Sequence, residues 1–364
     1  MITRITTLVV LFCAILFATS VSVQARNDNL IINTPAGERK DLRVEIPASE
    51  NNPETFIPVS VLKGASPGPT VLMVAGVHGY EFAPILATQR LAEEIDPETL
   101  SGNLVIVRVA HIPAFEGRSP YVNPIDRKNL NRSFPGKPDG TQTEQIAWAL
   151  SSKIIPTADF VLDIHSGDGA EWLDAFVGVY GGLLSSDYQS AFKFAETMGF
   201  ANIVRYSMNT QDQIDRRRSL NRQAVAQGLP TILIEIGQNG SRDPDHIEAI
   251  VSGVKRGLST LGMLDPAGNA VKKSLRYFEG TQSVPVKHSG VWTPTASTKR
   301  FVEKGETLGT IHDYQGILVE TVKAPIAGFT LYGLAGPPVR AGESIATIAK
   351  PATRADLNPV TSQK

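Results

Sequence analysis

Two long apolar stretches of the sequence each end in side chains that can bind a metal ion. Thr70–Val77 is followed at once by His78 and then, within the next turn of chain, by Glu81. Phe160–Ile164 is followed by His165. Two imidazoles and one carboxylate are common ligands of catalytic zinc, which keeps a fourth position for water. The sequence therefore predicts one zinc ion per chain, although nitrogen and oxygen ligands also accept other divalent ions.

Glycines and carboxylates near these positions fit the same chemistry. Gly76 and Gly79 allow the backbone to turn tightly around the first two ligands. Asp163 precedes His165 by two residues and could orient its imidazole from behind. Glu235 follows another apolar stretch, where low polarity raises the pKa of a carboxyl group. Glu235 is therefore the candidate general base, which takes a proton from water and passes it to the leaving group.

The segment 118–136 is rich in proline, arginine and asparagine. Guanidinium groups bind carboxylates in a bidentate manner, so this segment is a candidate to hold a substrate carboxylate or a developing oxyanion. Without the metal ligands on either side of it, the simpler interpretation is a solvated basic loop.

Between and around these residues, continuous apolar runs alternate with segments in which apolar residues recur at helical spacing. The continuous apolar runs predict buried strands, and the helical spacing between them predicts helices. Alternating strands and helices predict an α/β fold, in which helices flank a mostly parallel sheet. In such sheets ligands bind at the carboxyl ends of the strands, where the histidines and Glu235 are expected. The expected strands are 42–47, 56–62, 70–77, 104–110, 160–164, 176–180 and 231–236, and helices are expected at 84–95 and from 141 onward.

The two ends of the chain differ from this pattern. Residues 1–25 combine a cationic start, an apolar run too short for a membrane span and an Ala-containing cleavage site, so they predict a signal peptide and a periplasmic or secreted protein. The catalytic domain is then expected over 26–272. Short strands with Gly and Pro punctuation predict a small all-β, barrel-like domain over 273–350. The polar segment 351–364 predicts a disordered tail.

Composition limits the partners and the ligands. The chain has 364 residues, 42% of them hydrophobic, and a formal net charge of -1. This balance gives no electrostatic basis for binding nucleic acid or, after cleavage of the signal, a membrane. Cys13 is the only cysteine and lies in the apolar run, so the mature chain has no thiolate ligand and no disulfide. The oligomeric state stays open.

Four motifs in order resemble the zinc carboxypeptidase clan, and in particular its succinylglutamate desuccinylase/aspartoacylase branch. They are His78-x-x-Glu81, the segment 129–136 (NLNRSFPG), the segment 163–167 (DIHSG) and Glu235. The resemblance extends from about Thr70 to Glu235, and the β-rich C-terminal part is similar to the second domain of that branch. It implies a zinc carboxypeptidase-like sheet.

The resemblance also implies a role for each residue that matches a motif. His78, Glu81 and His165 correspond to the zinc ligands, and Glu235 corresponds to the general base. The pair Asn131 and Arg132 corresponds to the group that binds the substrate carboxylate. Arg118 is the candidate that polarises the scissile carbonyl and stabilises its oxyanion, while Arg127 lies closer to the pair and could share or take that role.

These observations predict an exported zinc hydrolase that removes an acyl group from an N-acyl amino acid or a similar small carboxylate. A carboxypeptidase acting on peptides, such as cell-wall stem peptides, has the same site and stays open, as does an ester substrate. A third alternative is an inactive metal-binding scaffold whose β-rich domain binds a partner. The sequence does not distinguish the acyl group or the amine part.

Overall fold

The computed structural model describes residues 29–50, 52–182, 188–215, 218–266, 274–295 and 300–357. The predicted signal peptide, residues 1–25, lies outside these ranges. The helices are α1 (Asn29–Ile32), α2 (Phe82–Glu94), α3 (Ile112–Glu116), η1 (Leu130–Arg132), α4 (Gln142–Ala149), η2 (Leu150–Ile154), η3 (Ile155–Thr157), α5 (Tyr188–Thr197), α6 (Gln211–Asp215), α7 (Leu220–Ala226) and α8 (Pro244–Thr260).

The strands alternate with these helices up to α8 and then follow one another to the end of the described chain. They are β1 (Glu38–Ile46), β2 (Thr55–Lys63), β3 (Ser66–Ala75), β4 (Ser101–Val107), β5 (Phe160–His165), β6 (Glu171–Leu173), β7 (Phe176–Gly182), β8 (Asn202–Met208), β9 (Thr231–Glu235), β10 (Arg276–Pro285), β11 (Gly290–Pro294), β12 (Phe301–Val302), β13 (Thr307–His312), β14 (Leu318–Lys323), β15 (Gly328–Leu334), β16 (Pro338–Val339) and β17 (Ser344–Ala352). Each of the seven predicted strands overlaps one of them.

The main sheet is mixed, and its centre is parallel. The strand order is β1-β2-β4-β3-β5-β9-β7-β8-β10-β17-β15-β12. The four strands β4, β3, β5 and β9 run parallel to one another. Strand β2 is antiparallel to β4, β1 is antiparallel to β2, and β7 is antiparallel to β9. The predicted α/β class with a mostly parallel central sheet is therefore confirmed.

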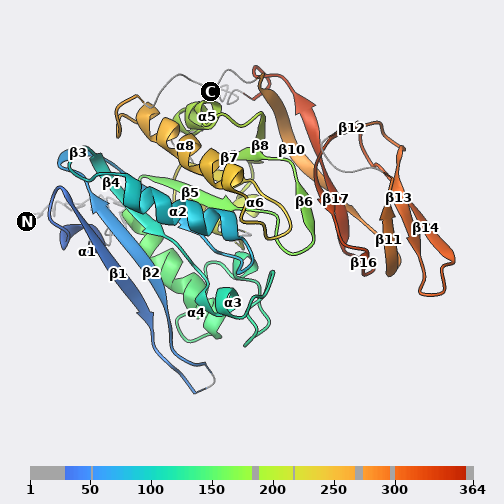
Figure 1. Cartoon of the computed structure of the whole chain (residues 1–364), viewed down its shortest axis with the longest axis horizontal. Coiled ribbons are helices and arrows are strands. Elements are labelled where there is room, and N and C mark those ends of the chain that lie inside the picture. The colour runs from blue at the N-terminus through green and yellow to red at the C-terminus, as the bar shows by residue number, and fades with distance from the viewer. Residues whose placement is uncertain are drawn as a thin grey trace, which may run out of the picture.

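Helices cover both faces of this sheet, which explains why its central strands are continuously apolar. In β3, Val71 and Met73 pack on one face with side chains of α2, α5 and α8. Leu72 and Val74 point to the other face, where they pack with α4, η2 and α7. Figure 1 shows α2 and α8 side by side over the sheet, with α4 beyond it. None of the helices in the described ranges is long and apolar enough to cross a bilayer.

The β-rich C-terminal region is joined to the main sheet. Strand β10 pairs in parallel with β8, and β17 and β15 extend the sheet beyond it. A second sheet, β14-β13-β11-β16, packs against these strands around Trp292, Ile311 and Ile348. Figure 1 shows the second sheet at the end of the molecule farthest from β1. The predicted boundary at 272/273 therefore crosses one continuous sheet.

The prediction that the whole segment 351–364 is a disordered tail is wrong for its first half. Pro351 and Ala352 are the last residues of β17 and pair with β10. Leu357 is fully buried in the main core, and its carbonyl oxygen accepts a hydrogen bond from the hydroxyl of Tyr188 at 3.2 Å. The polar composition of the segment concealed this buried leucine. Residues 358–364 lie outside the described ranges.

Candidate metal centre

The predicted metal ligands meet at the carboxyl ends of neighbouring parallel strands. The chain leaves β3 through Gly76, whose φ of +66° lies in the left-handed region, and then passes His78 in a turn. Glu81 is the residue before the first turn of α2. His165 is the last residue of β5, and it is paired in register with Glu235 at the end of β9. Strand ends and a helix start thus bring all four side chains to one edge.

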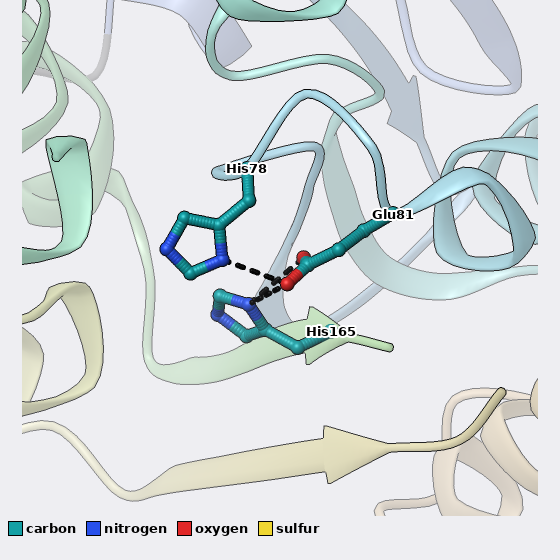
Figure 2. Close-up of side chains that lie close together, drawn as sticks. All are labelled: His78, Glu81 and His165. Carbon is teal, nitrogen blue, oxygen red and sulfur yellow. Dashed lines mark hydrogen bonds and ion pairs between the residues drawn. The ribbon is translucent and has the colours of Figure 1, made fainter. Parts of the chain in front are cut away.

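Two imidazoles converge on a single carboxylate. His78 Nδ1 lies 2.7 Å from Glu81 Oε1, and His165 Nδ1 lies 2.9 Å from Glu81 Oε2. Figure 2 shows both rings pointing at the Glu81 carboxylate, with His165 on the end of its strand. The ring centroids are 5.3 Å apart. Glu81 and His165 are buried, whereas His78 is partly open to solvent.

This geometry fits a divalent metal ion. One donor atom from each of His78, Glu81 and His165 can be chosen so that all three lie within 4.8 Å of one another. The donor set of two nitrogens and one oxygen is the set expected for zinc with an open fourth position.

Groups behind the ligands hold their orientation. His165 Nε2 lies 2.8 Å from Asp163 Oδ1, because residues two apart on a strand point to the same face. Asp163 is fully buried, and its Oδ2 accepts a hydrogen bond from Asn221 Nδ2 at 3.2 Å. His78 Nε2 lies 3.3 Å from Asn129 Oδ1. The predicted orienting partner Asp163 is therefore in contact with its histidine, and the two asparagines are further partners.

The charges of the three ligands are strongly coupled. Burial raises the pKa of the Glu81 carboxyl, but the imidazoles of His165 and His78 outweigh it and bring that pKa down to about 2. Burial lowers the pKa of His165, but Asp163 and Glu81 outweigh it and raise that pKa well above its usual value. The carboxylates of Glu81 and Asp163 thus favour a positive charge between them, which a proton on His165 supplies and a divalent ion can supply in its place.

Glu235 lies beside these ligands in different surroundings. Its carboxyl follows the buried residues of β9, and burial raises its pKa well above the usual value against the opposing effect of His165. A carboxyl with a raised pKa can exchange a proton near neutral pH, as a general base requires.

The ligands and Glu235 line a cavity of about 870 Å³ that extends to the C-terminal strands. Asn131 and Arg132, predicted from the sequence to bind substrate, also line it. Asn131 is fixed from behind, because its Oδ1 accepts a hydrogen bond from the backbone N–H of Leu220 at 3.0 Å. The other lining residues are Tyr121, Asn129, Ser166, Glu171, Leu173, Phe176, Tyr180, Tyr206, Arg218, Ser219, Asn221, Arg222, Leu233, Thr281, Ser283, Leu331, Tyr332, Ser344 and Thr347.

Arg132 has two arginine neighbours that were not chosen as site residues from the sequence. Burial, together with the positive charges of Arg222 and Arg218, lowers the pKa of Arg132. All three guanidinium groups belong to residues that line the cavity. The capping serine at the start of α7, Ser219, places Arg222 in the first turn of that helix. This local signal is too weak to identify Arg222 without the tertiary structure.

Arg118 and Arg127 do not line the cavity. Arg118 follows α3 with a φ of 49°, and Arg127 has a φ of 60°. Both residues are exposed to solvent. The arginines that line the cavity are Arg132, Arg218 and Arg222 instead.

Comparisons with known proteins agree with the fold and identify the family. Residues 67–261, more than half of the chain, match the model of the succinylglutamate desuccinylase/aspartoacylase catalytic domain. A deacetylase of Halomonas elongata, named for N-alpha-acetyl-L-2,4-diaminobutyric acid, is 27% identical over 301 residues, which cover 81% of this chain and 86% of the relative.

Solved structures are similar over most of their length. The ectoine utilization protein EutE (DoeB) of Ruegeria pomeroyi, solved with product bound, has a TM-score of 0.77 at 23% identity, covering 87% of this chain and 98% of that one. A succinylglutamate desuccinylase/aspartoacylase of Rhodobacter sphaeroides has a TM-score of 0.75 at 23% identity, covering 86% of this chain and 96% of that one. The family match and the shared fold lead to one conclusion: the chain belongs to the succinylglutamate desuccinylase/aspartoacylase family.

Proposed function

We propose that this protein is an exported, zinc-dependent deacylase that hydrolyses the amide bond of an N-acyl amino acid. The observation that carries the proposal is the content of one cavity: a set of metal ligands, a buried carboxyl beside them and a cluster of guanidinium groups. The Halomonas elongata relative, named as a deacetylase of an N-acetylated amino acid, supports the same reaction type.

The metal site supplies electrophilic activation. Zinc held by His78, Glu81 and His165 provides Lewis acidity toward the scissile carbonyl and toward water. Asp163 holds the His165 ring so that its Nδ1 faces Glu81. This support fixes the direction in which the ligand nitrogen points.

Glu235 moves the proton. It takes a proton from the attacking water and delivers it to the leaving nitrogen, so that one water and one amide yield a carboxylate and an amine. The raised pKa of Glu235 suits both halves of this transfer. Its place in register beside His165 puts it next to the metal ligands.

Arg132 and Asn131 bind the substrate carboxylate, with Arg218 and Arg222 adding positive charge to the same part of the cavity. Guanidinium groups suit this role because they bind carboxylates in a planar, bidentate geometry. A substrate held there by its carboxylate has its acyl group free to reach the metal ligands.

Export rests on the N-terminal sequence. Residues 1–25 carry the cationic start, the apolar run and the small residues before a cleavage site that a signal peptide needs. Expression of the full chain followed by fractionation and N-terminal sequencing tests this. We expect a mature chain that begins near Arg26 in the periplasm or medium.

The experiment that tests the reaction uses purified protein with its metal content measured. We expect about one zinc per chain, loss of activity after removal with a chelator, and recovery on adding zinc. The protein is then assayed with N-acyl amino acids and with short peptides. Hydrolysis of acyl amino acids supports the deacylase, whereas release of C-terminal residues from peptides alone contradicts it and favours a carboxypeptidase.

A further inference from the structure

The cavity contains an acidic wall that the proposed mechanism does not use. We define it as Asp168, Glu171, Tyr121 and Tyr332. Glu171, Tyr121 and Tyr332 line the cavity, and Asp168 is fully buried beside them. Its residues come from the loop after β5, from strand β6, from the segment 118–136 and from strand β15. No single motif in the sequence therefore reveals it.

Glu171 is held in place from two sides. Its Oε1 accepts a hydrogen bond from the hydroxyl of Tyr121 at 2.5 Å, and its Oε2 accepts one from the backbone N–H of Asp168 at 3.1 Å. Tyr332 lies opposite β6 in the paired strand β15, and the charge of Glu171 contributes to raising the pKa of its hydroxyl. Two aromatic side chains thus flank one fixed carboxylate.

The wall lies next to the metal ligands. The ring of Tyr121 meets the ring of His78 edge-on, with centroids 6.0 Å apart. Burial raises the pKa values of Asp168 and Glu171, and the negative charge of Glu81 raises both further. A ligand whose scissile bond faces the metal ligands can therefore also place a group against Glu171.

The wall carboxyls form no ion pair in the described parts of the chain, and the positive charges that act on them are those of His165 on Asp168 and of His78 on Glu171. Both carboxylate oxygens of Asp168 are buried without a hydrogen-bond partner there. The ion pairs seen across the same ranges include neither Asp168 nor Glu171. Burial raises the pKa of both carboxyls because a charged carboxylate is costly there, and a cationic ligand beside them favours their charged forms.

The wall is also distinct from the guanidinium cluster. The charged groups that act on Arg132 are Arg222, Tyr180 and Arg218. Those that act on Glu171 are Tyr121, Asp168, Glu81 and His78. The ion pairs seen in the described ranges join none of Arg132, Arg218 and Arg222 to Glu171 or Asp168, so the guanidinium cluster does not neutralise the wall.

We propose that the acidic wall binds a primary ammonium group of the substrate, which is therefore an acylated amino acid carrying both a carboxylate and a positively charged amine. A carboxylate between two tyrosine rings suits an alkylammonium, because the ring faces attract cations while the carboxylate accepts its hydrogen bonds. This inference rests on the proposed deacylase function and defines its substrate class.

The ammonium can sit on either side of the scissile amide, so the test uses two matched substrate pairs. N-acetyl-2,4-diaminobutyrate is compared with N-acetylnorvaline, in which a methyl group replaces the side-chain ammonium. β-Alanylnorvaline is compared with butanoylnorvaline, in which a methyl group replaces the ammonium of the acyl part. The pair with the larger ratio of kcat/KM identifies which part of the substrate carries the charge.

In the natural enzyme we expect the ammonium member of one pair to be preferred by about 10- to 100-fold in kcat/KM, the effect of a hydrogen bond to a charged group. In Glu171→Gln this ratio falls to within about threefold of one. The readout is a ratio within one variant, so a partly inactive preparation does not obscure it. Glu116→Gln, which removes an exposed carboxylate at the end of α3, keeps the natural ratio.

Several outcomes overturn the inference. The inference is overturned if the natural enzyme shows a kcat/KM ratio near one for both substrate pairs. It is also overturned if Glu171→Gln leaves the ratio unchanged. A second divalent ion per chain that is lost in Glu171→Gln assigns the wall to a metal instead. If no acyl substrate is hydrolysed, the proposed function itself fails. In that case binding is measured by calorimetry. The inference requires that 2,4-diaminobutyrate binds the natural protein more tightly than norvaline does, and that the two bind Glu171→Gln equally.

Discussion

At the scale of single residues, the site depends on Glu81. Its buried carboxylate lies within hydrogen-bond distance of both histidines, so a metal ion bound there replaces contacts that already hold the three side chains together. The residues that contact the other side of each histidine then fix the orientation of its ring nitrogens. Asp163 and Glu235 flank His165 on its own and the neighbouring strand, and they have different roles.

Asp163→Asn is expected to weaken zinc binding about 10- to 100-fold, because His165 loses the carboxylate that orients it. Zinc affinity measured by competition with a chelator checks this. Asp139→Asn, at an exposed position in a loop, is the matched control and is expected to bind zinc as the natural protein does. Equal affinity in Asp163→Asn and the control contradicts the orienting role.

Glu235→Gln is expected to reduce kcat about 10²- to 10⁴-fold while zinc content stays near one per chain. The raised pKa of Glu235 also predicts that activity falls on the acidic side at a higher pH than an ordinary glutamate allows, because the protonated carboxyl cannot accept a proton from water. The profile of kcat/KM against pH checks this. Full activity of the variant rules out Glu235 as the base.

At the scale of elements, the turn between β3 and α2 is built around close packing on α3. A Cβ atom at Gly79 would lie 2.2 Å from the backbone carbonyl carbon of Ala114. The turn can therefore place His78 and Glu81 only if this position has no side chain. His111, just before α3, is fully buried, and its Nδ1 lies 3.3 Å from the carbonyl oxygen of Val77 in the same turn.

Gly79→Ala is expected to lower the free energy of unfolding by about 1–3 kcal/mol, as overpacking does, and to weaken zinc binding by moving the turn. Gly169→Ala is the matched control in the loop after β5. Its added Cβ meets side-chain carbons of Pro120 no closer than 3.4 Å, which is ordinary contact. Urea unfolding and zinc content of both variants check the prediction, and equal stability contradicts it.

His111 predicts a loss of stability in acid. Burial lowers its pKa to about 4 from the usual 6.5, so between these values the unfolded chain binds a proton that the folded chain excludes. Stability is full above pH 6.5 and falls toward pH 4, by on the order of 2–3 kcal/mol. Urea unfolding with a chelator present is expected to show a smaller fall in His111→Gln. An identical fall assigns the effect to other groups.

At the scale of the whole molecule, the C-terminal strands complete the cavity and the sheet together. Strand β6, which follows β5, pairs with β15, and Tyr332 of β15 lines the cavity. Phe278, Phe329 and Leu331 pack with β7, β8 and β9 in one core cluster. The C-terminal region is therefore a wall of the site and a part of the main core.

A chain that ends at residue 266 tests this integration. It lacks β10, one of the two strands that pair with β8, and it lacks the C-terminal part of the core cluster around Phe278. We expect it to lose cooperative unfolding and zinc-dependent activity, because an open hydrophobic sheet edge replaces a paired one. Circular dichroism during urea unfolding checks the result. A cooperative, active truncated protein shows instead that the predicted domain boundary is a real one.

Much of the fold could be predicted because the central strands are buried on both faces and are therefore continuously apolar. The seven expected strands and the helices at 84–95 and 141 match observed elements to within a few residues. Strands β8 and β6 were not predicted. Strand β8 has a polar half, and β6 is short and owes its conformation to pairing with β15.

The candidate metal ligands, and also Asp163 and Glu235, could be found from the sequence because they lie at or next to the ends of apolar strands, and parallel strands end at the same edge. The charges that line the cavity could be found only from the packing of the whole chain. Arg118 and Arg127 are exposed to solvent and do not line the cavity, whereas Arg222 and Glu171 line it from segments distant in sequence. The physical reason is that strand periodicity is local, whereas a cavity wall forms when remote segments pack together.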